Sequence, residues 1–209
     1  MSPPASPRRR TGSRTKPPRA AAGADRMPPL PPARLTRAQR RAARELESGR
    51  RGKVIGPFVP ALRSPELMSR LQRLGEYLRY DNVLGRRLTE LAVLLTARSW
   101  TQQFEWALHV SIATEEGVPH AVIEAIAAGR RPRALPAQDA AVYDVFVELR
   151  DTQAVSDPTY ARAVAELGEA GVIDLIGVIG YYSTLAMIMN VARTPLPPGY
   201  TPQLPPLEK

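Results

Sequence analysis

Two adjacent segments decide the fold: RRLTELAVLLTARSW at residues 86–100 and TQQFEWALHVSIATEEG at residues 101–117. In the first segment Leu88, Leu91 and Leu95 recur at the three- and four-residue spacing of one helix face. The second segment ends in a glycine, which is typical of the end of a helix. The sequence therefore predicts two consecutive helices here.

Further helical segments lie on both sides of this pair. Ser64 and Pro65 form a typical helix start, and leucines follow at helical spacing (Leu67, Leu71, Leu74 and Leu78), which predicts an apolar face. No long stretch alternates with the period of a strand. The predicted fold class is all-α, a bundle of about six to seven helices over residues 65–80, 86–100, 102–117, 119–128, 136–153, 157–168 and 172–193.

The charge is distributed unevenly along the chain, which has 209 residues and a formal net charge of +9. Residues 1–52 hold 14 basic and 3 acidic residues, whereas residues 53–200 hold 14 basic and 16 acidic residues. The basic excess therefore belongs to an N-terminal arm. We predict three parts: a basic Pro/Arg-rich arm over 1–52, a helical domain over 53–198 and a Pro-rich tail over 199–209. Within the arm, residues 1–33 are predicted to be disordered, and residues 35–51 are predicted to form a helix that packs on a neighbour.

The absence of cysteine excludes several classes of chemistry. Without thiols the chain has no disulfide, no thiolate nucleophile, no C-x-x-C redox pair and no cysteine-bound metal. Its two histidines, His109 and His120, form no metal-binding motif such as HExxH. We expect neither a metal nor another cofactor.

Targeting signals are weak. Arg8, Arg9 and Arg10 are not followed by the apolar stretch that an export signal needs, so export is disfavoured and a cytoplasmic location is expected. The sequence leaves open whether the protein starts at Met1 or at Met27. The apolar run 172–192 contains Asp174, which favours a buried core helix over a membrane span. Binding of nucleic acid or of a membrane surface through the arm is the least favoured of three hypotheses for the function. The arm has no aromatic residues and no folded module that could recognise a nucleic acid.

Glu105 and His109 are the first candidates for chemistry. They stand four residues apart, so on a helix they share one face, where a carboxylate can orient an imidazole and raise its basicity. Gln102 extends that face. A helix-stabilising surface pair is the alternative interpretation. Trp106 is more typical of a core or subunit interface than of substrate stacking, and Tyr182 fits either a core or a pocket lining.

Three segments carry a family resemblance: RLTELAVLL at 87–95, QQFEWALH at 102–109 and ATEEGV at 113–118. They resemble the carboxymuconolactone decarboxylase family, which includes the alkylhydroperoxidase D-like proteins, and the resemblance extends from about Gly56 to Pro198. The redox branch of that family carries a glutamate, a C-x-x-C and a histidine. At those positions this chain has Glu90, then Gln102 and Glu105 in place of the cysteines, then His109.

The resemblance implies an alkylhydroperoxidase D-like helical fold in which Glu90, Glu105 and His109 form one cluster. Thiol peroxidase activity needs a thiolate, so this chain would carry the family's antioxidant name without that activity. The Glu105 and His109 pair is instead similar to the decarboxylase-like branch, which acts on a small lactone or keto acid. His109 would be the acid or base, Glu105 would orient it, and Glu90 would stay partly protonated beside its like-charged neighbour.

We therefore expect a cofactor-free, lyase-like enzyme acting on a small carboxylated molecule. Gln102, Trp106 and Tyr182 are the predicted substrate-binding residues, with Arg98 or Arg193 holding the substrate carboxylate. The resemblance implies a homo-oligomer, a trimer or hexamer. The second hypothesis is a non-catalytic oligomeric binding or scaffold protein, in which Glu105 and His109 form a contact between subunits.

Overall fold

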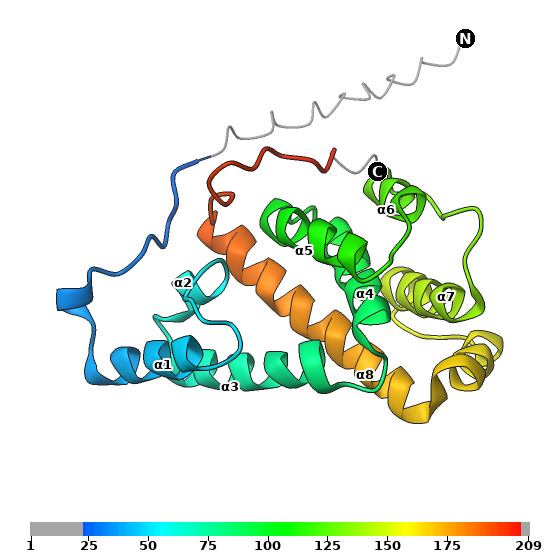
Figure 1. The fold of residues 1–209 in the computed structure, drawn as a ribbon, viewed down its shortest axis with the longest axis horizontal. Helices are drawn as coiled ribbons and strands as arrows, with labels where there is room; N and C mark the ends of the chain where they lie inside the picture. The colour runs from blue at the N-terminus through cyan, green and yellow to red at the C-terminus, as the bar shows by residue number, and fades with distance from the viewer. Residues whose placement is uncertain (1–22, 206–209) are drawn as a thin grey trace, which may run out of the picture.

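The computed structural model describes residues 23–205, and within that range it consists of helices without a strand (Figure 1). The all-α fold class is confirmed, although the short α2 and the π-helix η2 were not predicted. In chain order the elements are η1 (Pro32–Arg34), α1 (Arg37–Ser48), α2 (Phe58–Ala61), α3 (Pro65–Glu76), η2 (Tyr77–Asp81), α4 (Arg86–Ser99), α5 (Gln103–Glu115), α6 (His120–Ala127), α7 (Ala137–Thr152) and α8 (Asp157–Ala192).

Helix α4 is the centre of the fold. Every residue from Leu88 to Arg98 is buried, as expected of a helix that neighbours surround on all sides. Helices α5, α7 and α8 pack directly on it, and Figure 1 shows α4 enclosed between them. A polar side chain on this helix must therefore find its partner inside the protein.

Helix α8 has a break near its first third. Gly168 adopts φ 72° and ψ 164°, which interrupts the helix where the sequence predicts one helix to end and the next to begin. The second part runs across the core, and half of the most apolar 18-residue window of α8 is buried, although the helix is long and apolar enough to span a membrane. Asp174 is also buried, and it accepts hydrogen bonds from the Tyr77 hydroxyl at 3.0 Å and the Val83 amide at 3.0 Å.

Helix α1 packs on the rest of its own chain. Its buried residues Ala42 and Leu46 contact Phe58 and Met68 in a second, smaller core. The apolar stripe of this helix, which was expected to pack on a neighbour, is covered by α2 and α3 of its own chain (Figure 1). Most of the segment predicted to be disordered, and the last residues of the Pro-rich tail, lie outside the described residues.

The loop between α1 and α2 is pressed against α5. Gly56 in this loop has φ +55°, and a Cβ placed on it would lie 2.5 Å from the Phe104 ring. Both the backbone conformation and the close approach require glycine here. The contact places the preceding residues of the loop over the start of α5.

We predict that Gly75→Ala destabilises the protein although alanine favours helix. A Cβ at this position of α3 would lie 2.1 Å from the Tyr181 hydroxyl and 2.4 Å from Nη2 of Arg51. The clash should outweigh the gain in helix propensity and lower the free energy of unfolding by about 1–3 kcal/mol, measured by urea denaturation. Arg70→Ala, on an exposed position of the same helix, is the control and should stay within about 0.5 kcal/mol of the wild type. Equal stability of Gly75→Ala and wild type would contradict this packing.

Candidate active site

Glu90, Glu105 and His109 form one buried cluster between α4 and α5. Nδ1 of His109 lies 2.6 Å from a carboxylate oxygen of Glu90, and Nε2 lies 3.3 Å from a carboxylate oxygen of Glu105. None of the three residues is more than 4% exposed. The cluster implied by the family resemblance is therefore present in the structure, with all its contacts inside one chain.

The two carboxylates take different positions around the imidazole. Glu90 comes from the fully buried α4 and makes the shorter bond, so it fixes the orientation of the ring. Glu105 precedes His109 by one turn of α5 and lines a cavity together with it. The orienting role expected for Glu105 thus falls to Glu90 in this geometry.

Gln102 sets the start of α5. Its side-chain oxygen accepts hydrogen bonds from the amides of Phe104 at 2.6 Å and Glu105 at 3.4 Å, which caps the helix. Its amide nitrogen donates to Asn190 on α8 at 3.0 Å. Gln102 therefore positions the helix that carries Glu105 and His109, and it does not line their cavity.

The cluster favours a protonated imidazole. Burial alone lowers the pKa of His109, but the charges and hydrogen bonds of Glu90 and Glu105 outweigh burial and raise the pKa to about 9. At neutral pH His109 is therefore a cation held between two carboxylates, with an N–H on each ring nitrogen. Such a group can deliver a proton.

Tyr182 on α8 stands beside the imidazole. The two rings meet edge to face, with centroids 5.2 Å apart. Its hydroxyl is buried and has no hydrogen-bond partner among residues 23–205. Burial, followed by the negative charges of Glu90 and Glu105, raises the pKa of Tyr182 well above its ordinary value. The hydroxyl keeps its proton and is free to donate to a ligand.

A cavity of about 270 Å³ opens onto this cluster. His109, Glu105 and Tyr182 form one end of it. Its remaining wall combines apolar side chains with four cations: Arg50, Arg51, Lys53 and Arg79. A small space with a few convergent polar groups is typical of a site for a small molecule, and these cations select an anion.

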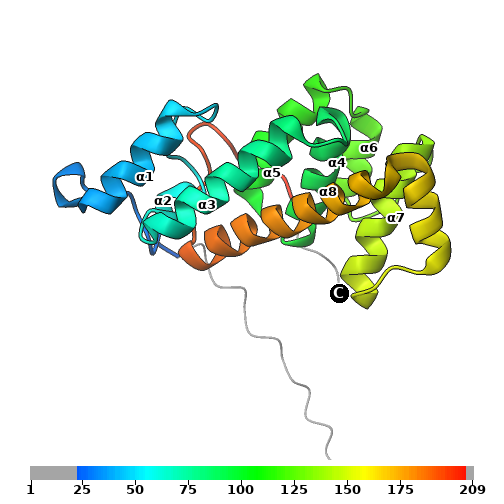
Figure 2. The ribbon, with the colours of Figure 1, turned by 90° about the horizontal axis from the view of Figure 1, so that it is seen from below.

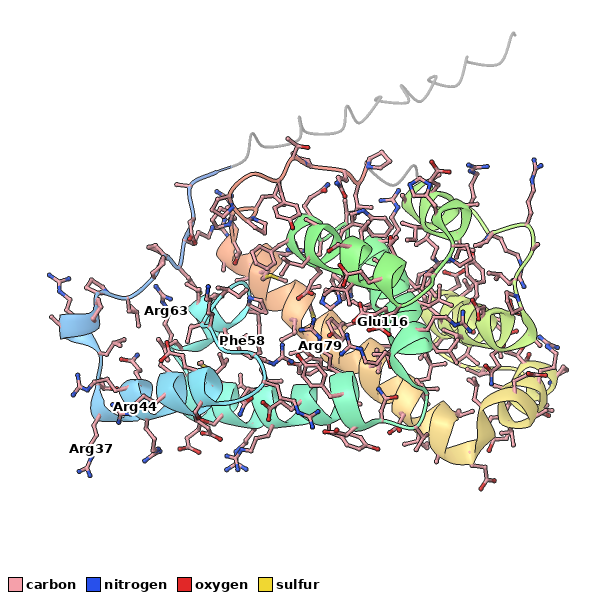
Figure 3. The ribbon with its side chains drawn as sticks, viewed as in Figure 1. Arg37, Arg44, Phe58, Arg63, Arg79 and Glu116 are labelled. Carbon is pink, nitrogen blue, oxygen red and sulfur yellow. The ribbon has the colours of Figure 1, made fainter. Side chains whose placement is uncertain are left out.

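Arg51 and Arg79 are the two best-placed cations. Arg51 donates to the Tyr181 hydroxyl at 3.0 Å and stacks over Phe58 at 4.9 Å, and Arg79 stacks over Tyr80 at 5.4 Å. Figure 3 shows Phe58 and Arg79 on the inner side of the α2–α3 layer, toward α5 and α8. The Nε atoms of Arg51 and Arg79 are buried without an acceptor among the described residues.

Sequence reasoning missed both arginines. They lie on a loop and on a π-helix, where no regular spacing marks a residue as facing inward.

The other predicted site residues lie elsewhere. Trp106 is 2% exposed and belongs to the main hydrophobic core, which agrees with its core interpretation and not with substrate contact. Arg98 lines a separate cavity, and Arg193 ends α8 beside another hollow. Neither reaches the space at His109, so the carboxylate-holding role predicted for them is not supported. Within residues 23–205 no group of three or more histidine or carboxylate side chains is arranged to hold a metal ion.

Comparison with known proteins identifies the family of the central region. Residues 65–146 match the model of the carboxymuconolactone decarboxylase family. These residues include Glu90, Gln102, Glu105 and His109, so the resemblance to that family seen in the sequence is confirmed over this region.

One solved structure supports the same fold. It is a protein of unknown function from Agrobacterium tumefaciens, suggested to be the antioxidant defence protein AhpD, with a TM-score of 0.55 and 18% sequence identity. The match covers 66% of this chain and 94% of that one. At this identity the likeness shows the fold alone, and it confirms the alkylhydroperoxidase D-like architecture. No curated protein matches the chain.

We predict that stability falls with rising pH because of His109. Its pKa of about 9 in the folded protein exceeds the ordinary value of 6.5, so its contribution is complete below about pH 6.5 and is lost as pH rises through about 9. The free energy of unfolding should fall by about 3 kcal/mol across this window, measured by urea titrations at fixed pH. The double variant Glu90→Gln, His109→Gln should lose most of this dependence. A wild-type profile as flat as that of the variant would contradict the cluster.

Proposed function

We propose that the cavity at His109 performs acid–base chemistry on a small carboxylated molecule, as a decarboxylation or a lactone or keto-acid conversion. The observation that carries the proposal is the pairing of His109 with both Glu90 and Glu105 at the end of a cation-lined cavity. Family membership of residues 65–146 supports this class of activity without fixing the reaction.

The cationic wall supports a carboxylate as the recognised group. Guanidinium groups bind carboxylates through paired hydrogen bonds, and Arg51 and Arg79 each have a buried Nε without an acceptor among the described residues. A substrate carboxylate between them would satisfy both. The rest of the molecule would then extend toward His109 and Tyr182 at the other end of the same cavity.

The proposed decarboxylation needs one proton. The carbon–carbon bond to the departing carboxylate breaks, CO₂ leaves, and the electron pair is delocalised into the adjacent carbonyl as an enolate. Tyr182 donates a hydrogen bond to the enolate oxygen. Nε2 of His109, on the Glu105 side of the ring, supplies the proton to the carbon, and solvent restores it.

The full sequence contains no cysteine, so the chain lacks the thiolate on which thiol peroxidase activity depends. The scaffold hypothesis assigned Glu105 and His109 to a contact between subunits. In the structure both are buried, and His109 pairs with Glu105 and with Glu90 within one chain, which supports the active-site interpretation instead.

We predict that His109→Asn abolishes turnover. Asparagine cannot deliver a proton from Nε2, so the rate should fall at least 100-fold, by the usual contribution of a general acid. The assay follows CO₂ release and incorporation of solvent deuterium, by NMR, from carboxymuconolactone and a panel of lactone and keto-acid carboxylates. His120→Asn is the matched control, because His120 is exposed and does not line the cavity, and it should retain full activity. Unchanged turnover in His109→Asn would exclude the proposed role.

We also propose that a second copy of the chain covers an apolar stripe on α8. The stripe consists of exposed residues that recur at helical spacing: Ile173, Ile176, Met187 and Val191. Gly180 lies between them and offers room for the backbone of a second chain.

The apolar face predicted for α3 adds to this surface. Leu67 and Leu74 on that helix are 46% and 47% exposed, so the face points largely outward. Figure 2 looks onto the side of the molecule where α3 and α8 lie in front of α5, and one hollow is lined jointly by Leu67, Met187 and Val191. An exposed apolar stripe of this kind supports the homo-oligomer, a trimer or hexamer, that the family resemblance implies.

We predict that Ile173→Asp dissociates this oligomer. Ile173 is 67% exposed in the isolated chain, so the substitution should leave the monomer folded while placing a charge in the interface. Sedimentation velocity should show a species of more than one chain for the wild type and a monomer for the variant. Tyr160→Asp, on an exposed residue outside the stripe, should keep the wild-type mass. A monomeric wild type at about 50 µM, a concentration at which a stable interface persists, would contradict the proposal.

A further inference from the structure

A second cavity, of about 380 Å³, lies between α4, α6 and α7. It shares no lining residue with the cavity at His109. Its wall is largely apolar and aromatic, including Leu95, Tyr143 and Phe146, and three arginines face it: Arg98, Arg130 and Arg150. Nothing in the proposed acid–base function uses this space.

Arg98 is buried at this cavity without a carboxylate partner. The residue is 5% exposed, and its Nη1 donates to the Pro205 carbonyl at 2.8 Å. Its Nε is buried and has no acceptor among residues 23–205, and no carboxylate in that range forms an ion pair with it. Burial lowers the pKa of Arg98, and no nearby negative charge of the described residues offsets that effect.

Arg87, on the same helix, shows the usual arrangement. Its guanidinium lies 2.7 Å from the carboxylate of Asp139, which is completely buried. That carboxylate raises the pKa of Arg87, whereas burial lowers that of Arg98. A buried cation costs free energy unless it is paired, so an anion bound at Arg98 would offset that cost.

The rim of the cavity adds positive charge. Arg130 is exposed and makes no ion pair within the described part of the chain. Arg150 stacks over Phe146 at 5.8 Å and pairs with Asp151 at 2.5 Å, so its charge is largely neutralised. A ligand in the cavity would therefore meet two uncompensated cations beside aromatic and aliphatic walls.

We propose that this cavity binds a small organic carboxylate with an aromatic or alicyclic body, with its carboxylate on Arg98 and its body against Tyr143, Phe146 and Leu95. Paired hydrogen bonds from the guanidinium would satisfy the free Nε. The cavity is at the small end of the range for ligand sites, which fits a molecule of one ring. The site is independent of the chemistry at His109.

The test uses 4-bromobenzoate as the probe and the full chain as the protein. In crystals soaked with the probe, anomalous scattering should place the bromine among Tyr143, Phe146 and Leu95. Calorimetry in solution should show binding at least 10-fold weaker for Arg98→Met and 2- to 3-fold weaker for Arg130→Ala. The exposed Arg133, which does not line the cavity, supplies the control, and Arg133→Ala should bind as the wild type does. The neutral analogue 4-bromobenzamide should bind at least 10-fold more weakly than the acid.

The position of the bromine distinguishes this site from the cavity at His109, because the two cavities share no lining residue, so failure of the acid–base proposal would leave this one standing. A further measurement separates ligand binding from a purely structural role of Arg98. Arg98→Met should melt within a few degrees of the wild type without the probe, because it removes no ion pair among the described residues. Equal affinity in Arg98→Met, or bromine only at Arg51 and Arg79, would overturn the proposal. Glu208 belongs to the C-terminal tail, outside the described residues. If the probe binds only after Glu208→Gln, the chain's own tail and not an added ligand supplies the anion for Arg98, and the proposal is overturned as well.

Discussion

The hydrogen bond between Nδ1 of His109 and the carboxylate of Glu90, 2.6 Å long and closed to solvent, is the contact on which the site depends. Glu90 lies in the middle of a helix that is buried on all sides, so its charge has to be compensated inside the protein. His109 supplies that compensation and in return is fixed in orientation and kept protonated. The same interaction therefore links α5 to α4 inside the protein and sets the charge state of the imidazole.

The cavity divides its tasks between two parts of the chain. The acid–base cluster lies entirely within residues 65–146, the region that matches the family. Arg51 lies before that region, on the loop held against α5 by Gly56, and Tyr182 lies after it on α8. The cluster of the matched region is therefore combined with wall residues that come from both sides of that region, while Arg79 comes from within it. This arrangement allows the substrate to differ while the proton-transferring groups stay in place.

Much of the architecture could be predicted because helices bury periodic faces. The predicted helices recur in the structure, and the spacing shared with the family was enough to predict that Glu90, Glu105 and His109 meet. Periodicity does not say which face meets a partner, so the outward position of Leu67 and Leu74 on α3 could not be foreseen. Periodicity also gives no signal in loops or in short or irregular helices, so neither α2 nor the roles of Arg51 and Arg79 could be predicted from it. Arg98 was predicted to hold the substrate carboxylate, yet it lines a different cavity from His109.

The most direct test of the central claim is the protonation of His109 itself. Nitrogen-15 NMR of protein labelled at the imidazole rings distinguishes a ring with two N–H groups from a neutral one, and His109→Asn identifies the signal. If Glu90 and Glu105 hold a cation between them, the His109 signal stays that of an imidazolium through neutral pH, and the group titrates with a pKa of about 9. A neutral His109 ring at pH 7.5, titrating near the ordinary histidine value, would contradict the account.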